Sequence, residues 1–294
     1  MHVGSLGGGI LNRVALIAGA AAIATAAVFE RSPIARIAKG CGLPPAPPPR
    51  ADNVRVSEAF LHSRAAGRRV GMVIVEPTRV DCCDQRRVCY LLPGRGGSAM
   101  DHVTGLHLAD HLGAVMKDES LKPLTLIAVD GGESYWHARA GGENRRAMLL
   151  DEIVAAHESR ISTVRRGLMG WSMGGYGALL AAAVKPELFR AVCTASAALW
   201  QSAEEQERAV PDAFDGPADF NRNNVFKEIG KYRGTRMRVD CGMQDPFYGA
   251  NAALVRALES DGQHPETHFA PGCHDEWYWS RIAYDQLRFM ARAL

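Results

Sequence analysis

The sequence lacks an excess of charge of either sign. Its 34 Lys and Arg residues nearly balance its 32 Asp and Glu residues, which leaves a formal net charge of +2 at pH 7. A strongly basic surface favours binding to the phosphates of nucleic acid, so this balance gives no electrostatic case for a nucleic-acid partner. The apolar and charged fractions, 47% and 22%, are those of an ordinary globular protein.

Complete motifs for a metal or a nucleotide are absent as well. His107 and His111 lie four residues apart, which would place both on one helix face, but no third ligand is indicated. Surface or packing histidines are the simpler interpretation. Gly94-Arg95-Gly96-Gly97 is glycine-rich, yet it lacks the G-x-G-x-x-G spacing and an acidic ribose partner. We therefore expect neither a metal nor an organic cofactor.

The long apolar run of the sequence lies at the N-terminus. Residues 14–29 carry no charge and follow Arg13, and the small residues 24–26 are typical of a signal-peptide cleavage site. The run is slightly shorter than the about 20 residues of a membrane-spanning helix. We expect residues 1–30 to be a signal peptide or an N-terminal membrane anchor. The protein is then exported, and it is either secreted or held on the outer face of the cytoplasmic membrane through residues 10–29.

A proline-rich stretch follows the apolar run. Five of the six residues from 44 to 49 are proline, and consecutive prolines cannot continue a helix but form a stiff, extended spacer. We therefore interpret residues 31–53 as a linker and residues 54–294 as a catalytic domain.

The cysteine count is odd, so at least one of the seven stays free if export leads to pairing in an oxidising compartment. Cys241 and Cys273 precede two loops that carry candidate site residues, and they could pair. Cys89 could pair with Cys82 or Cys83. The alternative is that all seven cysteines are buried thiols.

Short apolar runs alternate with helical spacing through residues 54–294. This alternation predicts a mostly parallel sheet covered by helices on both faces, with ligands bound beyond the carboxyl ends of the strands. The polar stretch 200–233 is expected to be an insertion over the site. Strands are expected at 54–60, 69–75, 88–92, 124–129, 165–170, 189–193, 237–241 and 266–270, and helical stretches at 100–117, 144–159, 178–184, 249–259 and 277–293.

The segment Gly170-Trp171-Ser172-Met173-Gly174 connects an apolar strand to an alanine-rich helix. In such a turn the strained serine lifts its hydroxyl above the end of the sheet. A side chain at either glycine would collide with the neighbouring strand or helix. Ser172 is therefore the candidate nucleophile, and a glycine-rich turn with a solvated serine is the alternative.

A serine nucleophile needs a base and an acid that orients the base, and the order Ser, Asp, His is that of the α/β-hydrolases. His274 follows the last strand and is the candidate base. His102, His107 and His111 lie upstream of the serine, and His137, His157 and His264 lie in polar segments expected to be exposed. For the acid, Asp245 follows a strand on a loop, whereas Asp240, inside that strand, is the second choice.

Negative charge on the carbonyl oxygen of an ester must be met by two backbone N–H groups. One is expected from Met173, next to the nucleophile. The other is expected from the loop after the strand 88–92, where Arg95 and Gly96 are the candidates.

Several motifs resemble the esterase D / antigen 85 (mycolyltransferase) family of α/β-hydrolases. They are residues 170–179 around the serine, residues 90–97 with the glycine loop, residues 274–279 around the histidine, and Gly242-Met243-Gln244-Asp245. Pro93 stands where that family often has histidine. The resemblance covers about residues 55–294, and it implies an α/β-hydrolase fold with an insertion over the active site. It also implies an esterase, an S-formylglutathione hydrolase or a mycolyltransferase, similar to exported actinobacterial esterases.

The sequence thus predicts a serine carboxylesterase that hydrolyses a small-molecule or lipid ester through an acyl-enzyme. An acyltransferase that passes the acyl group to a sugar or lipid hydroxyl would use the same residues. A non-catalytic surface binding protein on this fold is disfavoured by the intact order of the three candidates. Contacts with the substrate are expected from Gly94, Gly96, Trp136, Trp171 and Trp277, although such tryptophans are often simply core residues.

Overall fold

The computed structural model describes residues 33–79, 85–158 and 163–294. The chain divides into two compact units, Met1–Leu43 and Pro44–Leu294. In the first unit, α2 (Pro33–Lys39) occupies part of the segment predicted as a linker, because a proline is tolerated in the first turn of a helix. Cys41 follows α2 and is disulfide-bonded. The predicted export segment lies outside the described residues.

The second unit is built on a sheet that has eight strands within the described part of the chain. Their order is β1-β2-β4-β3-β5-β6-β7-β8; β3 to β8 pair in parallel, whereas β2 pairs antiparallel with both β1 and β4. The predicted mostly parallel sheet is thus confirmed. The strands are β1 (Val54–Ser63), β2 (Arg68–Pro77), β3 (Gln85–Leu92), β4 (Thr125–Val129), β5 (Thr163–Trp171), β6 (Phe189–Ala195), β7 (Arg236–Gly242) and β8 (Glu266–Ala270).

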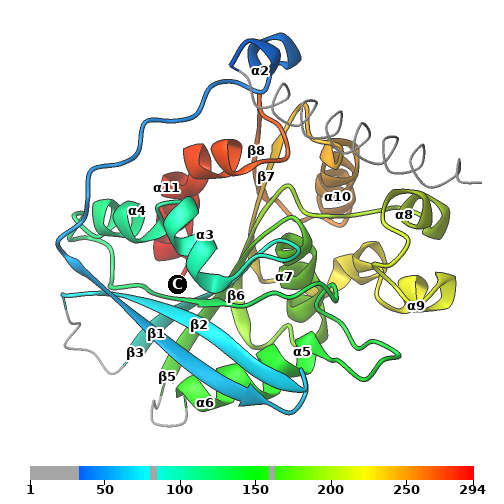
Figure 1. Cartoon of the computed structure of the whole chain (residues 1–294), viewed down its shortest axis with the longest axis horizontal. Coiled ribbons are helices and arrows are strands. Elements are labelled where there is room, and N and C mark those ends of the chain that lie inside the picture. Colours follow the sequence, from blue (N-terminus) through cyan, green and yellow to red (C-terminus); the bar gives the residue numbers. More distant parts are fainter. Residues whose placement is uncertain (1–32, 80–84, 159–162) are drawn as a thin grey trace, which may run out of the picture. The chain divides into compact units, whose positions relative to one another are not determined.

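Helices cover both faces of this sheet (Figure 1). One face carries α3 (Ala99–Gly105), α4 (Leu108–Val115) and α11 (Glu276–Ala293). The other carries α5 (Arg145–Ala147), the π-helical turn η1 (Met148–Ile153), α6 (Val154–Glu158), α7 (Met173–Val184) and α10 (Tyr248–Ser260). Each predicted helical stretch therefore contains a helix, and the predicted helix at 144–159 is divided by the π-helical turn.

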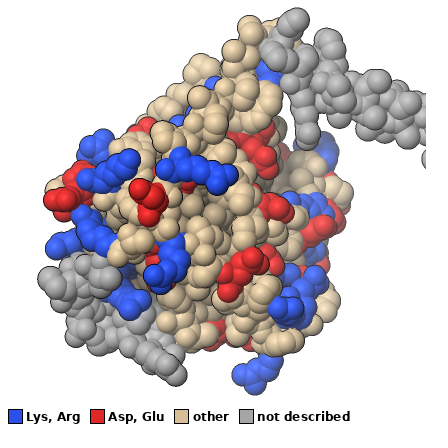
Figure 2. Space-filling model, turned by 60° about the vertical axis from the view of Figure 1, so that its left-hand side comes forward, with Lys and Arg blue, Asp and Glu red and all other residues tan. Residues whose placement is uncertain are grey.

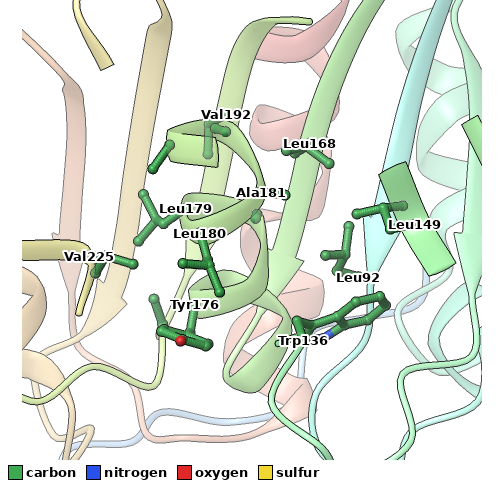
Figure 3. Close-up of a cluster of buried hydrophobic side chains, with 14 of the residues drawn as sticks. Leu92, Trp136, Leu149, Leu168, Tyr176, Leu179, Leu180, Ala181, Val192 and Val225 are labelled. Carbon is green, nitrogen blue, oxygen red and sulfur yellow. The ribbon is translucent and has the colours of Figure 1, made fainter. Parts of the chain in front are cut away.

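Alternate side chains of one strand pack into two separate hydrophobic cores, one on each face of the sheet. In β3, Tyr90 and Leu92 pack on the α7 side, whereas Leu91 packs on the α11 side. Figure 3 shows the α7 core, in which Tyr176, Leu179 and Leu180 of the helix lie among residues of the sheet and of the insertion. Burial of α7 on nearly all sides fixes its position, and with it the position of its N-terminus.

The polar stretch 200–233 is an insertion packed onto α7, not a separate unit. It forms α8 (Ala203–Ala209), α9 (Pro217–Arg222) and the 3₁₀ helix η2 (Val225–Tyr232). The Tyr232 hydroxyl donates to the Leu179 carbonyl at 3.2 Å, and the Tyr176 hydroxyl donates to the Asn223 carbonyl at 3.0 Å. These contacts join the insertion to α7.

In the described ranges, no helix has both the length and the apolar character needed to cross a membrane. Over the face shown in Figure 2, basic and acidic side chains lie next to one another. This face therefore presents no field of a single sign, in agreement with the balanced composition.

Close backbone packing at the end of β7 predicts a strong difference between two glycines. A Cβ on Gly242 would lie 2.2 Å from the Gly272 carbonyl oxygen, whereas a Cβ on Gly249, in α10, would meet nothing within 4 Å. We expect Gly242→Ala to lower the free energy of unfolding by about 3 kcal/mol through overpacking. Gly249→Ala should raise it by up to about 1 kcal/mol, because alanine has the higher helix propensity. Urea unfolding of both variants checks this, and equal stabilities would contradict the packing argument.

Candidate active site

Ser172 lies between β5 and α7 in a backbone conformation that residues with a Cβ rarely adopt. Its φ is 54° and its ψ is −120°. A Cβ on Gly174 would lie 1.8 Å from the Leu92 carbonyl oxygen, and a Cβ on Gly170 would lie 2.2 Å from the Gly174 carbonyl oxygen. The close approach predicted at both glycines is therefore present. The sharp turn leaves Ser172 half buried at the carboxyl end of β5.

The predicted base and acid come from two further loops and meet this serine. His274 Nε2 lies 2.9 Å from Ser172 Oγ, and His274 Nδ1 lies 2.8 Å from Asp245 Oδ2. The second carboxylate oxygen of Asp245 accepts the Phe247 N–H at 2.8 Å, and this carboxylate is fully buried. Donation from Nδ1 to the carboxylate leaves Nε2 free to accept the serine hydroxyl, which is the tautomer that a general base requires.

The loops that carry the acid and the base are joined directly to each other. The Gln244 N–H donates to the Gly272 carbonyl at 3.0 Å, and the Gly272 N–H donates to the Gln244 side-chain oxygen at 2.9 Å. These bonds extend the parallel pairing of β7 and β8 past the ends of both strands. The separation of Asp245 from His274 is therefore set by the sheet and not by free loops.

Asp240, the alternative acid, is fully buried and contacts other partners. Its carboxylate accepts hydrogen bonds from the Arg238 guanidinium at 2.8 Å and from the Gln286 amide at 2.9 Å. Burial raises the pKa of this carboxyl against the opposing effect of Arg238. Arg238 also pairs with Glu266. Asp240 thus belongs to an ion-pair cluster between β7 and α11, and Asp245 is the carboxylate beside His274.

The glycine loop after β3 offers one free amide. The Gly94 N–H donates to His102 Nε2 at 3.4 Å, and the Gly96 N–H donates to the Gly132 carbonyl at 2.9 Å. The Arg95 N–H makes no hydrogen bond within the described part of the chain. Met173 is the first residue of α7, so its N–H has no carbonyl one turn earlier. Arg95 is thus favoured over Gly96 as an oxyanion donor.

Aromatic rings hold the base from two sides. The ring centroids of Phe247 and Trp279 lie 5.2 Å and 5.1 Å from that of His274. The Trp279 indole N–H donates to Ser196 Oγ at 3.0 Å, which fixes its ring. The sequence gives only a weak indication that these two side chains lie at the site. Phe247 lies two residues after Asp245, and Trp279 lies five residues after His274.

Two of the tryptophans expected to contact substrate belong to the core, and that expectation is wrong for them. Trp136 is 1% exposed and packs against α7 at Gly177 (Figure 3), and Trp171 is 0% exposed on the opposite side of the sheet. Trp171 immediately precedes the turn, where its side chain still follows the alternation of β5. Trp277 is half buried in the first turn of α11, and its contact with substrate stays a prediction.

The cysteine pairings suggested by the sequence are wrong. Cys241 and Cys89 are free, buried thiols, and burial raises the pKa of each. Cys273 is disulfide-bonded. Cys241 lies inside β7 with its side chain in the fully buried interior, so its position directly before the acid loop does not bring it to Cys273. Cys82 and Cys83 lie outside the described residues.

One histidine differs from its expected environment, and another is buried beneath the glycine loop. His137 is fully buried instead of exposed, with Nε2 3.2 Å from Asp219 and its ring stacked on Phe214. His102, for which the sequence predicts no environment, is 9% exposed and lies beneath the glycine loop. Burial lowers the pKa of His102 to about 4. Across the described residues, no group of three or more potential ligands is arranged to hold a metal.

The side chain of Arg95 links the glycine loop to the insertion. The Arg95 guanidinium forms a two-pronged ion pair with Asp212 and lies 3.5 Å from Glu133. Arg139 makes a similar pair with Asp215 at 3.0 Å. The segment 212–215 of the insertion is thus held beside the loop that carries the free Arg95 amide, as expected for an insertion over the site.

Comparisons with known proteins identify the family and the fold. The family model described as "Putative esterase" matches residues 88–288. The "Uncharacterized peptidase y4sO" of Sinorhizobium fredii is 26% identical over 221 residues, or 68% of this chain, and the chain spans 28% of the length of that relative.

Solved structures share the α/β-hydrolase fold predicted for this chain. A ferulic acid esterase has a TM-score of 0.71 at 18% identity, over 83% of this chain and 100% of its own. An S-formylglutathione hydrolase from Staphylococcus aureus has a TM-score of 0.66 at 16% identity, over 81% of this chain and 99% of its own.

The two buried aspartates should respond oppositely to the same substitution. Asp245→Asn should reduce turnover of an ester by about 10⁴-fold through the wrong histidine tautomer, with little change in stability. Asp240→Asn should lower the free energy of unfolding by about 3 kcal/mol, because it removes a charge from a buried ion pair. It should leave the turnover of the folded protein within a few-fold. Steady-state kinetics and urea unfolding of both variants measure this, and the reverse pattern would assign the acid to Asp240.

Proposed function

This chain belongs to the Esterase family and is an ester-hydrolysing enzyme, and on this premise we propose that Ser172, His274 and Asp245 are its nucleophile, its general base and the acid that orients the base. The observation that carries the proposal is the pair of hydrogen bonds that runs from Ser172 Oγ through His274 to Asp245. A serine hydroxyl is a poor nucleophile at neutral pH, and this chain of contacts is what activates it.

The reaction then proceeds in two halves. His274 Nε2 takes the proton of Ser172 Oγ as that oxygen attacks the ester carbonyl carbon, and it returns the proton to the departing alcohol. The acyl group stays on Ser172. Water attacks this acyl-enzyme with His274 again as base, which releases the acid and restores the serine. The Asp245 carboxylate accepts the Nδ1 proton and stabilises the imidazolium, with its second oxygen held by the Phe247 N–H.

The negative charge of each tetrahedral intermediate is met by the backbone N–H groups of Arg95 and Met173. Two observations support this assignment. The neighbouring amides of Gly94 and Gly96 already have acceptors. A Cβ on Gly94 would lie 3.5 Å from the Ser172 Cβ, so the loop runs directly beside the nucleophile. Gly94 and Gly96 shape this loop, and substrate contacts through them follow from the same proximity.

The substrates are small-molecule esters, in accordance with the family. Family membership also sets aside the non-catalytic binding protein. Transfer of the acyl group to a sugar or lipid hydroxyl would use the same acyl-enzyme and stays a prediction, as do a lipid ester substrate and export through residues 1–30.

Removal of the nucleophile tests the proposal. Ser172→Ala should lower the turnover of p-nitrophenyl esters of graded chain length by about 10⁶-fold, because no other group forms the acyl-enzyme. Wild-type protein mixed with excess ester should release a burst of one equivalent of p-nitrophenol and gain the mass of one acyl group. An added sugar acceptor distinguishes transfer from hydrolysis by the product formed.

Ser260→Ala is the matched control, since Ser260 is exposed at the end of α10 and its hydroxyl contacts only the Arg256 carbonyl among the described residues. Its turnover should equal that of the wild type. Equal turnover by Ser172→Ala and wild type would refute the proposed function.

A further inference from the structure

The buried imidazole of His102 lies beneath the loop that connects β3 to α3. His102, on α3, accepts the Gly94 N–H at Nε2 at 3.4 Å, and its own backbone N–H donates to the Ser98 carbonyl at 3.2 Å. Between these two contacts, a Cβ on Gly97 would lie 2.8 Å from the ring. His102 therefore contacts the loop at its start, its middle and its end, with the ring at Gly94 and Gly97 and the backbone at Ser98.

These contacts require a neutral imidazole with one tautomer. Nε2 must carry no proton in order to accept from Gly94, so in the neutral ring Nδ1 carries the proton. Burial lowers the pKa of His102 to about 4, so the neutral form is present at the pH at which a histidine base operates. The far side of the ring packs on Trp171, which directly precedes Ser172, at a centroid distance of 5.6 Å.

The direction of the free amide follows from the same loop. The Gly94 carbonyl accepts the Gly97 N–H at 3.1 Å. In a trans peptide the C=O and the N–H point in opposite directions, so the Arg95 N–H points away from Gly97. The Gly94 carbonyl keeps this direction only if Gly94 itself stays in place, and the hydrogen bond that holds the Gly94 N–H ends on His102.

We propose that His102 is a positioning residue for the oxyanion hole. It holds Gly94 and Ser98 from beneath, so that the Arg95 N–H is aimed at the charge that develops on the carbonyl oxygen. This inference rests on the proposed function, because it presumes that Ser172 forms a tetrahedral intermediate. His102 touches neither the nucleophile nor the base in this structure, so its effect passes through Gly94 and Arg95.

Three substitutions distinguish the effect of the hydrogen-bond acceptor Nε2 from the effect of the volume of the imidazole ring. His102→Leu fills the space but leaves the buried Gly94 N–H unpaired. His102→Gln offers a side-chain oxygen at the reach of Nε2, whereas His102→Asn offers one only at the reach of Nδ1. We expect kcat/KM to fall by about 10- to 100-fold in His102→Leu and His102→Asn, with KM nearly unchanged, because removal of an oxyanion donor itself costs about 10²- to 10³-fold. His102→Gln should recover most of the loss.

Binding measurements distinguish positioning from general loss of structure. An alkyl boronic acid forms a tetrahedral adduct with an active serine, and its affinity should fall in parallel with kcat/KM across the three variants. The affinity of an ester for the same variants combined with Ser172→Ala should stay constant. The contrast between His102→Gln and His102→Asn decides the matter even if His102→Leu fails to fold. His264→Leu, an exposed histidine before β8, serves as the control and should match the wild type.

Two failures remain distinct in this design. Turnover that survives Ser172→Ala refutes the proposed function, and the inference falls with it. Serine-dependent turnover and boronate affinity that are unchanged in His102→Asn and His102→Leu refute the role of His102 alone. Loss of ester binding as large as the loss of boronate binding also refutes it, because the substitution would then act on the ground state.

Discussion

The close approach of the first turn of α7 to the carboxyl end of β3 is the constraint on which the site depends. The Gly174 backbone lies so near the Leu92 carbonyl that no side chain fits between them. This contact has two consequences. It bends the chain at Ser172 into its strained conformation, and it brings the loop that follows Leu92 beside the nucleophile. One packing contact therefore brings the start of α7 close to the loop that carries Arg95, although the two are far apart in sequence.

The parallel sheet links the turn at Ser172 to the loops that carry Asp245 and His274. Backbone hydrogen bonds continue past the strand ends, from Ser172 to Ala195 and from Ser196 to Asp240, and then from Met243 to Ala270. Each loop is thus tied to the next strand in the sheet. A register error between β7 and β8 would separate Asp245 from His274, and the reciprocal bonds of Gln244 with Gly272 oppose such an error. The contacts of His274 with Ser172 and Asp245 are thus supported by a continuous sheet.

The sequence was sufficient for the strands, the turn and the order of the three site residues, because those features depend on local patterns. Alternation and apolar runs predict strands wherever the chain is, and glycines that flank a serine predict a tight turn from short-range sterics. The choice of Asp245 over Asp240 also followed from local structure, since a residue inside a buried strand cannot turn toward a loop.

Features that depend on packing partners from distant parts of the sequence could not be predicted from local patterns. Trp136 and Trp171 are large and apolar, and Trp171 directly precedes Ser172, yet packing partners from other elements place both in the core. The pairing of Cys241 with Cys273 was plausible from position but fails on side-chain direction, because Cys241 lies inside β7. His102 was missed for a similar reason. Its role depends on a loop folding back over its own helix, and no spacing in the sequence encodes that contact.

Arg95 shows how one residue can serve two parts of the molecule through different atoms. The proposed oxyanion hole would use its backbone N–H, which any residue except proline would supply. The side chain makes a separate contact, because its guanidinium pairs with Asp212 of the insertion and lies beside Glu133. The identity of the residue at this position is therefore explained by the insertion and not by the chemistry. The direction of its backbone N–H is explained by the Gly94–Gly97 turn and by the His102 ring beneath it. The backbone and the side chain of Arg95 therefore make separate, compatible contacts.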